Sequence, residues 1–136
     1  LILDCSALAR WWMPGTEAPW VPDLPRQGGP FLAPELLRVE WANMLGKLVR
    51  FRGLSRGDAL AFRRRLEGLG VRWVPDAALL DGAWDLTDRV PLSVYDALYI
   101  QLARLAGAPL ATADARMSSA ARERGVEVLW AGGSKK

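Results

Sequence analysis

Residues 93–114, SVYDALYIQLARLAGAPLATAD, contain a predicted helix and the strand that follows it. Ser93 is a favoured N-cap, and Gly107 has the residue type that commonly ends a helix. Between them, leucines recur at the helical spacing expected of a buried stripe, at Leu98, Leu102 and Leu105. The apolar run 109–113 then predicts a buried strand, and Asp114 follows it directly. The stretch therefore predicts one helix–strand unit of an α/β fold, with an acid at the carboxyl end of the strand.

The same alternation extends along the chain in both directions. Short apolar stretches predict strands at 1–4, 30–33, 71–74, 109–113 and 126–130. Helical spacing and capping signals predict helices at 34–52, 56–69, 77–89, 94–106 and 115–124. Alternating strands and helices are typical of a parallel sheet covered by helices. We therefore predict a single three-layer α/β/α domain over residues 1–131, with a parallel, mostly five-stranded sheet.

Two segments fall outside this alternation. Residues 14–29 contain four prolines, which interrupt any long helix, so we expect a turn or two and a loop there. Residues 132–136, GGSKK, predict a flexible tail. No apolar run approaches the roughly 20 residues that span a bilayer, and the start of the chain lacks the features of a secretory signal. We therefore expect a soluble, cytoplasmic protein without a membrane partner.

Composition limits the chemistry that the chain can carry out. It has no histidine and one cysteine, Cys5, among 136 residues. Histidine-based acid–base catalysis, Ser-His and Cys-His nucleophile systems and cysteine-cluster metal sites are therefore excluded. Arginine supplies most of the 18 basic residues, and its planar fork suits phosphate, so a nucleic-acid partner is permitted. Any catalysis has to use carboxylates, hydroxyls, Lys or Arg, or a bound hard metal.

Four acids fall where a parallel sheet places its ligands. Asp4 follows the first predicted strand and Asp114 the fourth. In open parallel sheets, ligands bind beyond the carboxyl ends of the strands, where the strand order reverses. Asp96 lies in the first turn after the Ser93 cap, and Glu40 lies in the helix after the second strand. If the first and fourth strands are neighbours, these carboxylates come within reach of one ligand.

Carboxylates that share a cleft repel one another and need a counter-charge to remain ionised together. A divalent cation is the simplest counter-charge, and Mg²⁺ binds one or two carboxylates together with waters and substrate phosphate. Such a site suits hydrolysis of a phosphodiester, because the metal lowers the pKa of water. The pattern therefore predicts a Mg²⁺ or Mn²⁺ site formed by Asp4, Glu40, Asp96 and Asp114.

Each acid also has a purely structural interpretation. Asp4 and Asp114 are placed to cap helices that follow strands, with a contribution of about 1 kcal/mol each. The pair Ser93-x-x-Asp96 fits a capping box, and Glu40 could pair with a neighbouring arginine or face solvent. Four unrelated caps and pairs have no reason to fall at one edge of one sheet. That coincidence favours the metal-site interpretation.

At these acids the chain resembles the PIN-domain nucleases, and specifically the VapC-type toxins of toxin–antitoxin pairs. The resemblance covers nearly the whole chain and follows the family's order and spacing. It rests on four segments, LILDCSAL at 1–8, APELLRVEWANML at 33–45, SVYDALYIQLA at 93–103 and LATADARM at 110–117. Each segment centres on one of the four acids, so together they are more specific than any one alone.

The resemblance implies a metal-dependent endoribonuclease in which water attacks an RNA phosphodiester without a covalent enzyme intermediate. It makes Asp4 and Asp96 the chief metal ligands, adds Asp114 directly or through water, and has Glu40 orient the attacking water or accept its proton. It also implies a cognate antitoxin and a homodimer, whose surface we expect on exposed apolar residues of 34–69. The main alternative is a catalytically idle PIN-like module that binds RNA or protein.

Four further residues stand beside the acids. Ser6 and Thr112 match small hydroxyl positions of the family, where they would bind a carboxylate, a water or phosphate, unless they are an ordinary cap and strand residue. Asn43, one turn after Glu40, is placed to hold that carboxylate by a hydrogen bond. Arg116 stands where some relatives carry a further acid, which puts a second metal in doubt and suits a phosphate contact.

Aromatic residues are frequent near the start of the chain. Trp11, Trp12 and Trp20 fall near the expected rim of the cleft, where aromatic rings can stack on unpaired bases. Burial is the commoner role of large aromatic side chains, and we favour it here.

Overall fold

The computed structural model describes residues 1–13 and 30–130. Within these residues the strands are β1 (Ile2–Leu3), β2 (Leu32–Pro34), β3 (Arg72–Val74), β4 (Leu110–Thr112) and β5 (Val128–Trp130). The helices are α1 (Cys5–Trp12), α2 (Leu36–Phe51), α3 (Arg56–Glu67), α4 (Asp76–Thr87), α5 (Val94–Ala106) and α6 (Ala115–Glu123). The predicted segment 14–29, the tail 132–136 and Trp20 lie outside the described residues.

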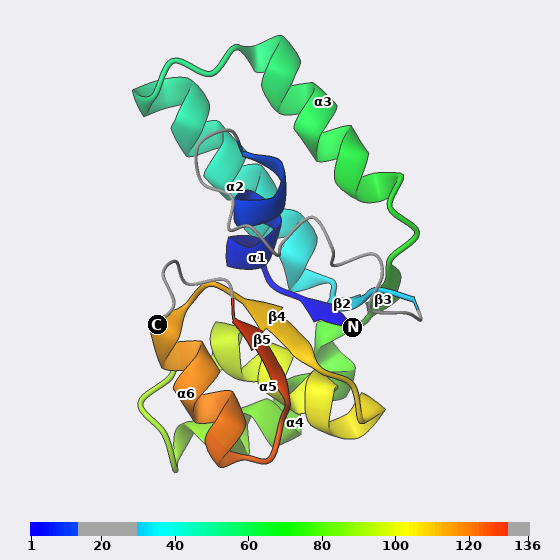
Figure 1. The fold of residues 1–136 in the computed structure, drawn as a ribbon, viewed down its shortest axis with the longest axis vertical. Helices are drawn as coiled ribbons and strands as arrows, with labels where there is room; N and C mark the ends of the chain where they lie inside the picture. Colours follow the sequence, from blue (N-terminus) through cyan, green and yellow to red (C-terminus); the bar gives the residue numbers. More distant parts are fainter. Residues whose placement is uncertain (14–29, 131–136) are drawn as a thin grey trace.

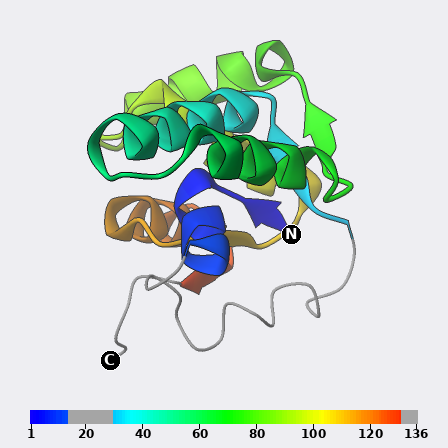
Figure 2. The same ribbon diagram turned by 90° about the horizontal axis from the view of Figure 1, so that it is seen from above.

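The strands form one parallel sheet in the order β3-β2-β1-β4-β5. Figure 1 shows α1, α2 and α3 on one side of this sheet and α4, α5 and α6 on the other. Figure 2 shows the molecule from above, with α1 and the α2–α3 pair in front of the strands. The predicted three-layer α/β/α fold with a parallel five-stranded sheet is therefore confirmed.

The strand order reverses at β1, which lies between β2 and β4. Ile2 is in register with Leu32 of β2 on one side and with Leu110 of β4 on the other. These inner strands are covered on both faces, and Ile2, Leu3 and Leu110 have no exposed surface. Burial on both faces explains why the strands are continuous apolar runs without polar alternation. The reversal places the carboxyl ends of β1 and β4 side by side.

Several predicted boundaries need correction. The strands are shorter than predicted because their outer residues extend beyond the hydrogen-bonded ladder. No helix was predicted at Cys5–Trp12, a helix of eight residues that precedes the proline-rich segment. Leu105 was expected in the buried stripe of α5, yet it is 65% exposed. It lies in the last turn of the helix, beyond the part that packs on the sheet.

Helix α5 matches its predicted ends because its capping signals are local. Ser93 Oγ accepts a hydrogen bond from the Asp96 backbone N–H at 3.2 Å. At the other end Gly107 adopts the left-handed conformation with φ 61°, which side chains disfavour.

Among the described residues, no helix is long and apolar enough to cross a membrane.

Candidate active site

The four acids singled out in the sequence line one pocket at the carboxyl ends of β1 and β4. The pocket has a volume of about 180 Å³. Its lining residues are Asp4, Cys5, Ser6, Glu40, Asp96, Tyr99, Asp114 and Met117. They come from the starts of α1 and α6, the first turns of α5 and the middle of α2, so four separate chain segments meet here.

Asp4 is the most buried of these acids, with 3% of its surface exposed. Its Oδ1 accepts hydrogen bonds from Ser6 Oγ at 2.7 Å and from the Ala7 backbone N–H at 2.8 Å. Its Oδ2 accepts a hydrogen bond from Thr112 Oγ1. A carboxylate offers about four acceptor positions, so one position on Oδ2 is left for a further ligand. Capping of α1 by Asp4 is therefore compatible with ligand binding.

The hydroxyls of Ser6 and Thr112 tie the start of α1 to the end of β4. Ser6 Oγ accepts a hydrogen bond from the Ala113 backbone N–H at 2.8 Å, and Thr112 Oγ1 accepts one from the Asp114 N–H at 3.0 Å. Each hydroxyl also donates to Asp4. The carboxylate was one of the partners expected for these hydroxyls. Together their hydrogen bonds fix Asp4 relative to the end of β4.

Asp114 caps α6 through one carboxylate oxygen. Its Oδ1 accepts hydrogen bonds from the backbone N–H groups of Arg116 at 2.9 Å and Met117 at 3.1 Å. No other hydrogen bond to its side chain is formed within residues 1–13 and 30–130. Its Oδ2 is therefore available to a ligand, and the capping role again does not compete with a site.

Glu40 is held by Tyr99, a residue that the sequence analysis did not single out. Tyr99 is 1% exposed, and its Oη donates a hydrogen bond of 2.5 Å to Glu40 Oε1. Burial, followed by the charge of Glu40, raises the pKa of Tyr99 well above its ordinary value, so it stays a donor. Tyr99 lies three residues after Asp96 on the same helix face, and this spacing was the signal available in the sequence.

Asn43 does not hold Glu40. It is exposed, and no hydrogen bond joins it to that carboxylate in the part of the chain that the structure describes. Asp76 contributes instead to the placement of α2, because its Oδ1 accepts a hydrogen bond from the Leu36 N–H at 3.1 Å. Arg116 is exposed outside the pocket lining, and its positive charge only partly opposes the rise that burial causes in the pKa of Asp96.

Burial disfavours the charged form of three of the pocket acids. Burial raises the pKa of Asp4 from 3.8 to about 6, against the opposing effect of its hydrogen bonds. Burial also raises the pKa of Glu40 and of Asp96, and a neighbouring aspartate adds to each rise. Cys5 has a pKa raised to about 12, mainly by burial, so it remains a neutral thiol. Among residues 1–13 and 30–130, no lysine or arginine lines the pocket.

This donor set fits a hard divalent cation. It offers carboxylate oxygens with free acceptor positions, a protonated thiol, and an excess of negative charge that a cation would relieve. Within the described residues, no three such side chains converge closely enough to form a complete metal cage. Mg²⁺ does not require one, because it keeps several waters and binds one or two carboxylates. Asp4, Asp96 and Asp114 would hold it.

Two of the three tryptophans near the start of the chain pack against the core. Trp12 is buried, and its ring lies 5.6 Å from the ring of Trp41. Trp11 is half-buried, with its ring 5.9 Å from that of Phe31. The interpretation as packing residues therefore holds for both.

Solved structures share this fold at low sequence identity. PAE2754 from Pyrobaculum aerophilum superposes with a TM-score of 0.70 at 20% identity, covering 93% of this chain and 81% of its own. Mycobacterium tuberculosis VapC20, described as a sarcin-ricin loop cleaving toxin, superposes with a TM-score of 0.65 at 20% identity, and the match covers 88% of this chain and 93% of VapC20. FitAcB from Neisseria gonorrhoeae superposes with a TM-score of 0.64 at 16% identity, and the match covers 94% of this chain and 95% of the FitAcB chain. These likenesses support the fold alone.

Comparison by sequence gives the family. No curated protein matches the chain by sequence. The family model of the PIN domain matches residues 2–123, which include all four acids of the pocket. The chain therefore belongs to the PIN domain family.

Proposed function

We propose that this protein is a metal-dependent endoribonuclease and the toxin of a toxin–antitoxin pair. The observation that carries the proposal is the meeting of Asp4, Glu40, Asp96 and Asp114 in one pocket, which no basic side chain of the described residues lines. Membership of the PIN family and the likeness to a toxin that cleaves the sarcin-ricin loop support it. The proposed reaction is hydrolysis of an RNA phosphodiester.

The residues of the pocket have distinct proposed roles. Bound Mg²⁺ or Mn²⁺ would polarise the phosphodiester and favour ionisation of water. Asp4 and Asp96 would hold the cation, Asp114 would join them directly or through water, and Ser6 and Thr112 fix the Asp4 carboxylate. Glu40, oriented by Tyr99, positions the attacking water and accepts its proton, since a half-buried carboxylate with a raised pKa is a suitable base.

We also propose two protein partners. A cognate antitoxin would silence the enzyme by covering the pocket and placing an Arg or Lys side chain against its acids, which have no such partner of their own. A second copy of the chain would pack on exposed apolar residues of α2 and α3, among which Val39 is 66% and Phe51 73% exposed. Both partners rest on the family resemblance.

Calorimetric titration with Mn²⁺ separates this enzyme from an idle binding module. The unchanged chain should bind at least one Mn²⁺, and more tightly at pH 8 than at pH 6, because Asp4 must lose its proton to become a ligand. Asp96→Asn should weaken the binding at both pH values. A chain that takes up no Mn²⁺ at pH 8 would favour the idle module.

Tyr99→Phe tests the role of Glu40 without removing a carboxylate. In the unchanged chain the hydrogen bond from Tyr99 lowers the pKa of Glu40. The variant lacks this hydrogen bond, so its Glu40 pKa should be higher. Cleavage at pH 7 should fall by about tenfold, and the acidic limb of the pH–rate profile should move to higher pH. Tyr95→Phe, at an exposed tyrosine of the same helix, is the control and should leave both unchanged. If the pH–rate profile of Tyr99→Phe does not shift, Glu40 is not the group that accepts the proton.

A further inference from the structure

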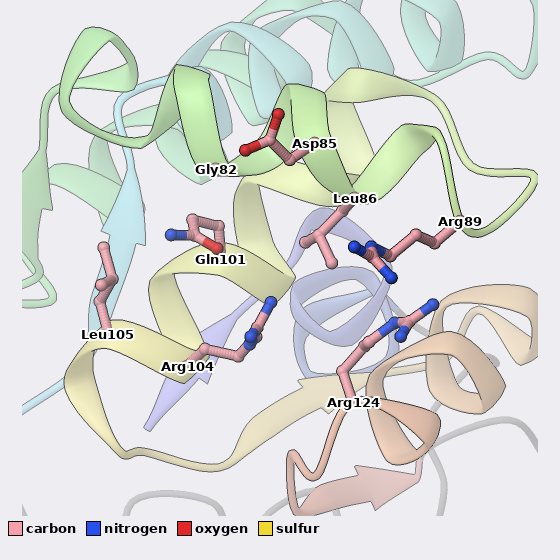
Figure 3. Close-up of a pocket in the computed structure, with 8 residues that line it drawn as sticks. All are labelled: Gly82, Asp85, Leu86, Arg89, Gln101, Arg104, Leu105 and Arg124. Atoms are coloured by element: carbon pink, nitrogen blue, oxygen red, sulfur yellow. The ribbon is translucent and has the colours of Figure 1, made fainter.

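A larger cavity lies in the layer of α4, α5 and α6, away from the acid pocket. Its volume is about 600 Å³. Figure 3 shows three arginine side chains from different elements extending into it, Arg89 after α4, Arg104 in the last turn of α5 and Arg124 after α6. No function discussed above uses these residues.

The three guanidinium groups have no acceptor among the residues that the structure describes. Within residues 1–13 and 30–130, none of them forms an ion pair or a side-chain hydrogen bond. The Nε of Arg124 is buried and has no hydrogen-bond partner, which is unfavourable for a polar group. Asp85 belongs to the cavity wall, but its carboxylate points away from the three groups in Figure 3. Grouped cations without a counter-charge favour an anion between them.

Gln101 adds a neutral donor to the same cavity. Its side chain lies against Gly82 of α4, where a Cβ would stand only 2.2 Å from the Gln101 Nε2. The absence of a side chain at this position therefore creates the space in which the amide lies. A side chain at position 82 would displace the Gln101 amide from the place that it occupies in this cavity.

A second cavity of about 410 Å³ shares part of this lining, and the acid Glu127 also belongs to its wall. Arg104 and Arg124 line both, and the second cavity runs along Gly107 to the residues before β5. We call the two cavities with Arg89, Arg104 and Arg124 the arginine trough. A trough with cations along its length suits a ligand with repeated negative charges better than a single small anion.

We infer that the arginine trough binds the backbone phosphates of the RNA strand that is cut in the acid pocket. This inference rests on the proposed function. The planar guanidinium fork matches two phosphate oxygens at once, and such charged hydrogen bonds are strong. The two sites lie towards opposite edges of the sheet, because Asp96 is at the start of α5 and Arg104 at its end, eight residues or about 12 Å further along the axis. A strand of several nucleotides spans that distance.

RNA binding without cleavage tests the inference. The chain carrying Asp96→Asn is titrated in EDTA into fluorescein-labelled single-stranded RNA, and anisotropy is followed at several NaCl concentrations. Adding Arg104→Gln or Arg124→Gln should weaken binding by roughly five- to tenfold. Each should also reduce the slope of log affinity against log salt by about 0.7, the value for one lost phosphate contact on a single strand.

Arg122→Gln is the matched control, because it removes the same charge from the exposed surface of α6. It should change affinity by less than about twofold and leave the slope unchanged. Thermal unfolding verifies that the variants are folded. If Arg124→Gln is unfolded, Arg104→Gln and Arg89→Gln, both at exposed positions, decide the test.

Two results would overturn the inference. One is that Arg104→Gln and Arg124→Gln bind RNA as Arg122→Gln does. The other is that Arg104→Gln weakens binding of labelled poly-glutamate and leaves RNA binding unchanged, which would make the trough a site for acidic protein segments. The proposed function is contradicted by a different result, namely that the unchanged chain does not cut RNA in Mn²⁺. That result does not depend on what the trough variants bind.

Discussion

Asp96→Asn should lower the rate of RNA cleavage by on the order of 1,000-fold while the fold is kept. Asparagine has the shape of aspartate but no charge, so the pocket loses a cation ligand and one of its four negative charges. The cap of α5 does not depend on the carboxylate, because Ser93 accepts the backbone N–H of residue 96. Single-turnover cleavage of labelled RNA at saturating Mn²⁺ measures the change.

The matched control for that variant is Asp81→Asn. Asp81 is an exposed acid of α4 that lines none of the pockets discussed above. It should leave the rate within about twofold, since a distant exposed charge is screened by salt. Asp96→Asn should unfold at nearly the same temperature as the unchanged chain. If it cleaves as fast as Asp81→Asn, Asp96 is not a ligand of the catalytic cation.

Asp4→Asn should stabilise the protein in EDTA while removing its activity. Burial opposes the charged form of Asp4 and raises its pKa from 3.8 to about 6. A pKa difference of one corresponds to about 1.4 kcal/mol, so the ionised Asp4 lowers the free energy of unfolding by up to about 3 kcal/mol at pH 7. The neutral amide avoids this cost, and its NH₂ group can donate to Thr112 Oγ1. Urea unfolding at pH 7 measures the gain.

The pH dependence of this gain has a definite sign. A carboxyl group whose folded pKa is raised binds its proton more tightly in the folded state, so it favours folding below about pH 4. That contribution is lost as the pH rises through about 6. The difference in unfolding free energy between Asp4→Asn and the unchanged chain should therefore grow from pH 4 to pH 7. A difference that is constant, or that favours the unchanged chain at pH 7, would contradict the burial of an unpaired charge.

Local signals explain which parts of the fold could be predicted. Ser93 and Gly107 define α5 because an N-cap and a left-handed C-cap depend on single residues. The carboxylates of Asp4 and Asp114 were placed because parallel strands carry their ligands at one edge. Their meeting still required β1 and β4 to be neighbours, which depends on long-range packing and which the sequence only suggested.

Contacts between distant segments explain what was missed. Tyr99 and Glu40 meet across 59 positions of the chain, and a tyrosine on an apolar helix face resembles an ordinary core residue in the sequence. Asn43 was expected at Glu40 from helical spacing, but its side chain is exposed to solvent. The arginine trough joins the ends of three helices, and no local pattern indicates that its arginines lack acceptors.

Metal dependence of RNA cleavage tests the central claim most directly. The purified chain, free of antitoxin, is freed of metal with EDTA and incubated with several labelled structured RNAs, first without metal and then with excess Mn²⁺. The four-carboxylate pocket predicts no cleavage in EDTA and specific cleavage of at least one RNA once Mn²⁺ is added. Cleavage that persists in EDTA, or an absence of cleavage of every RNA in Mn²⁺ beyond that of Asp96→Asn, would contradict it.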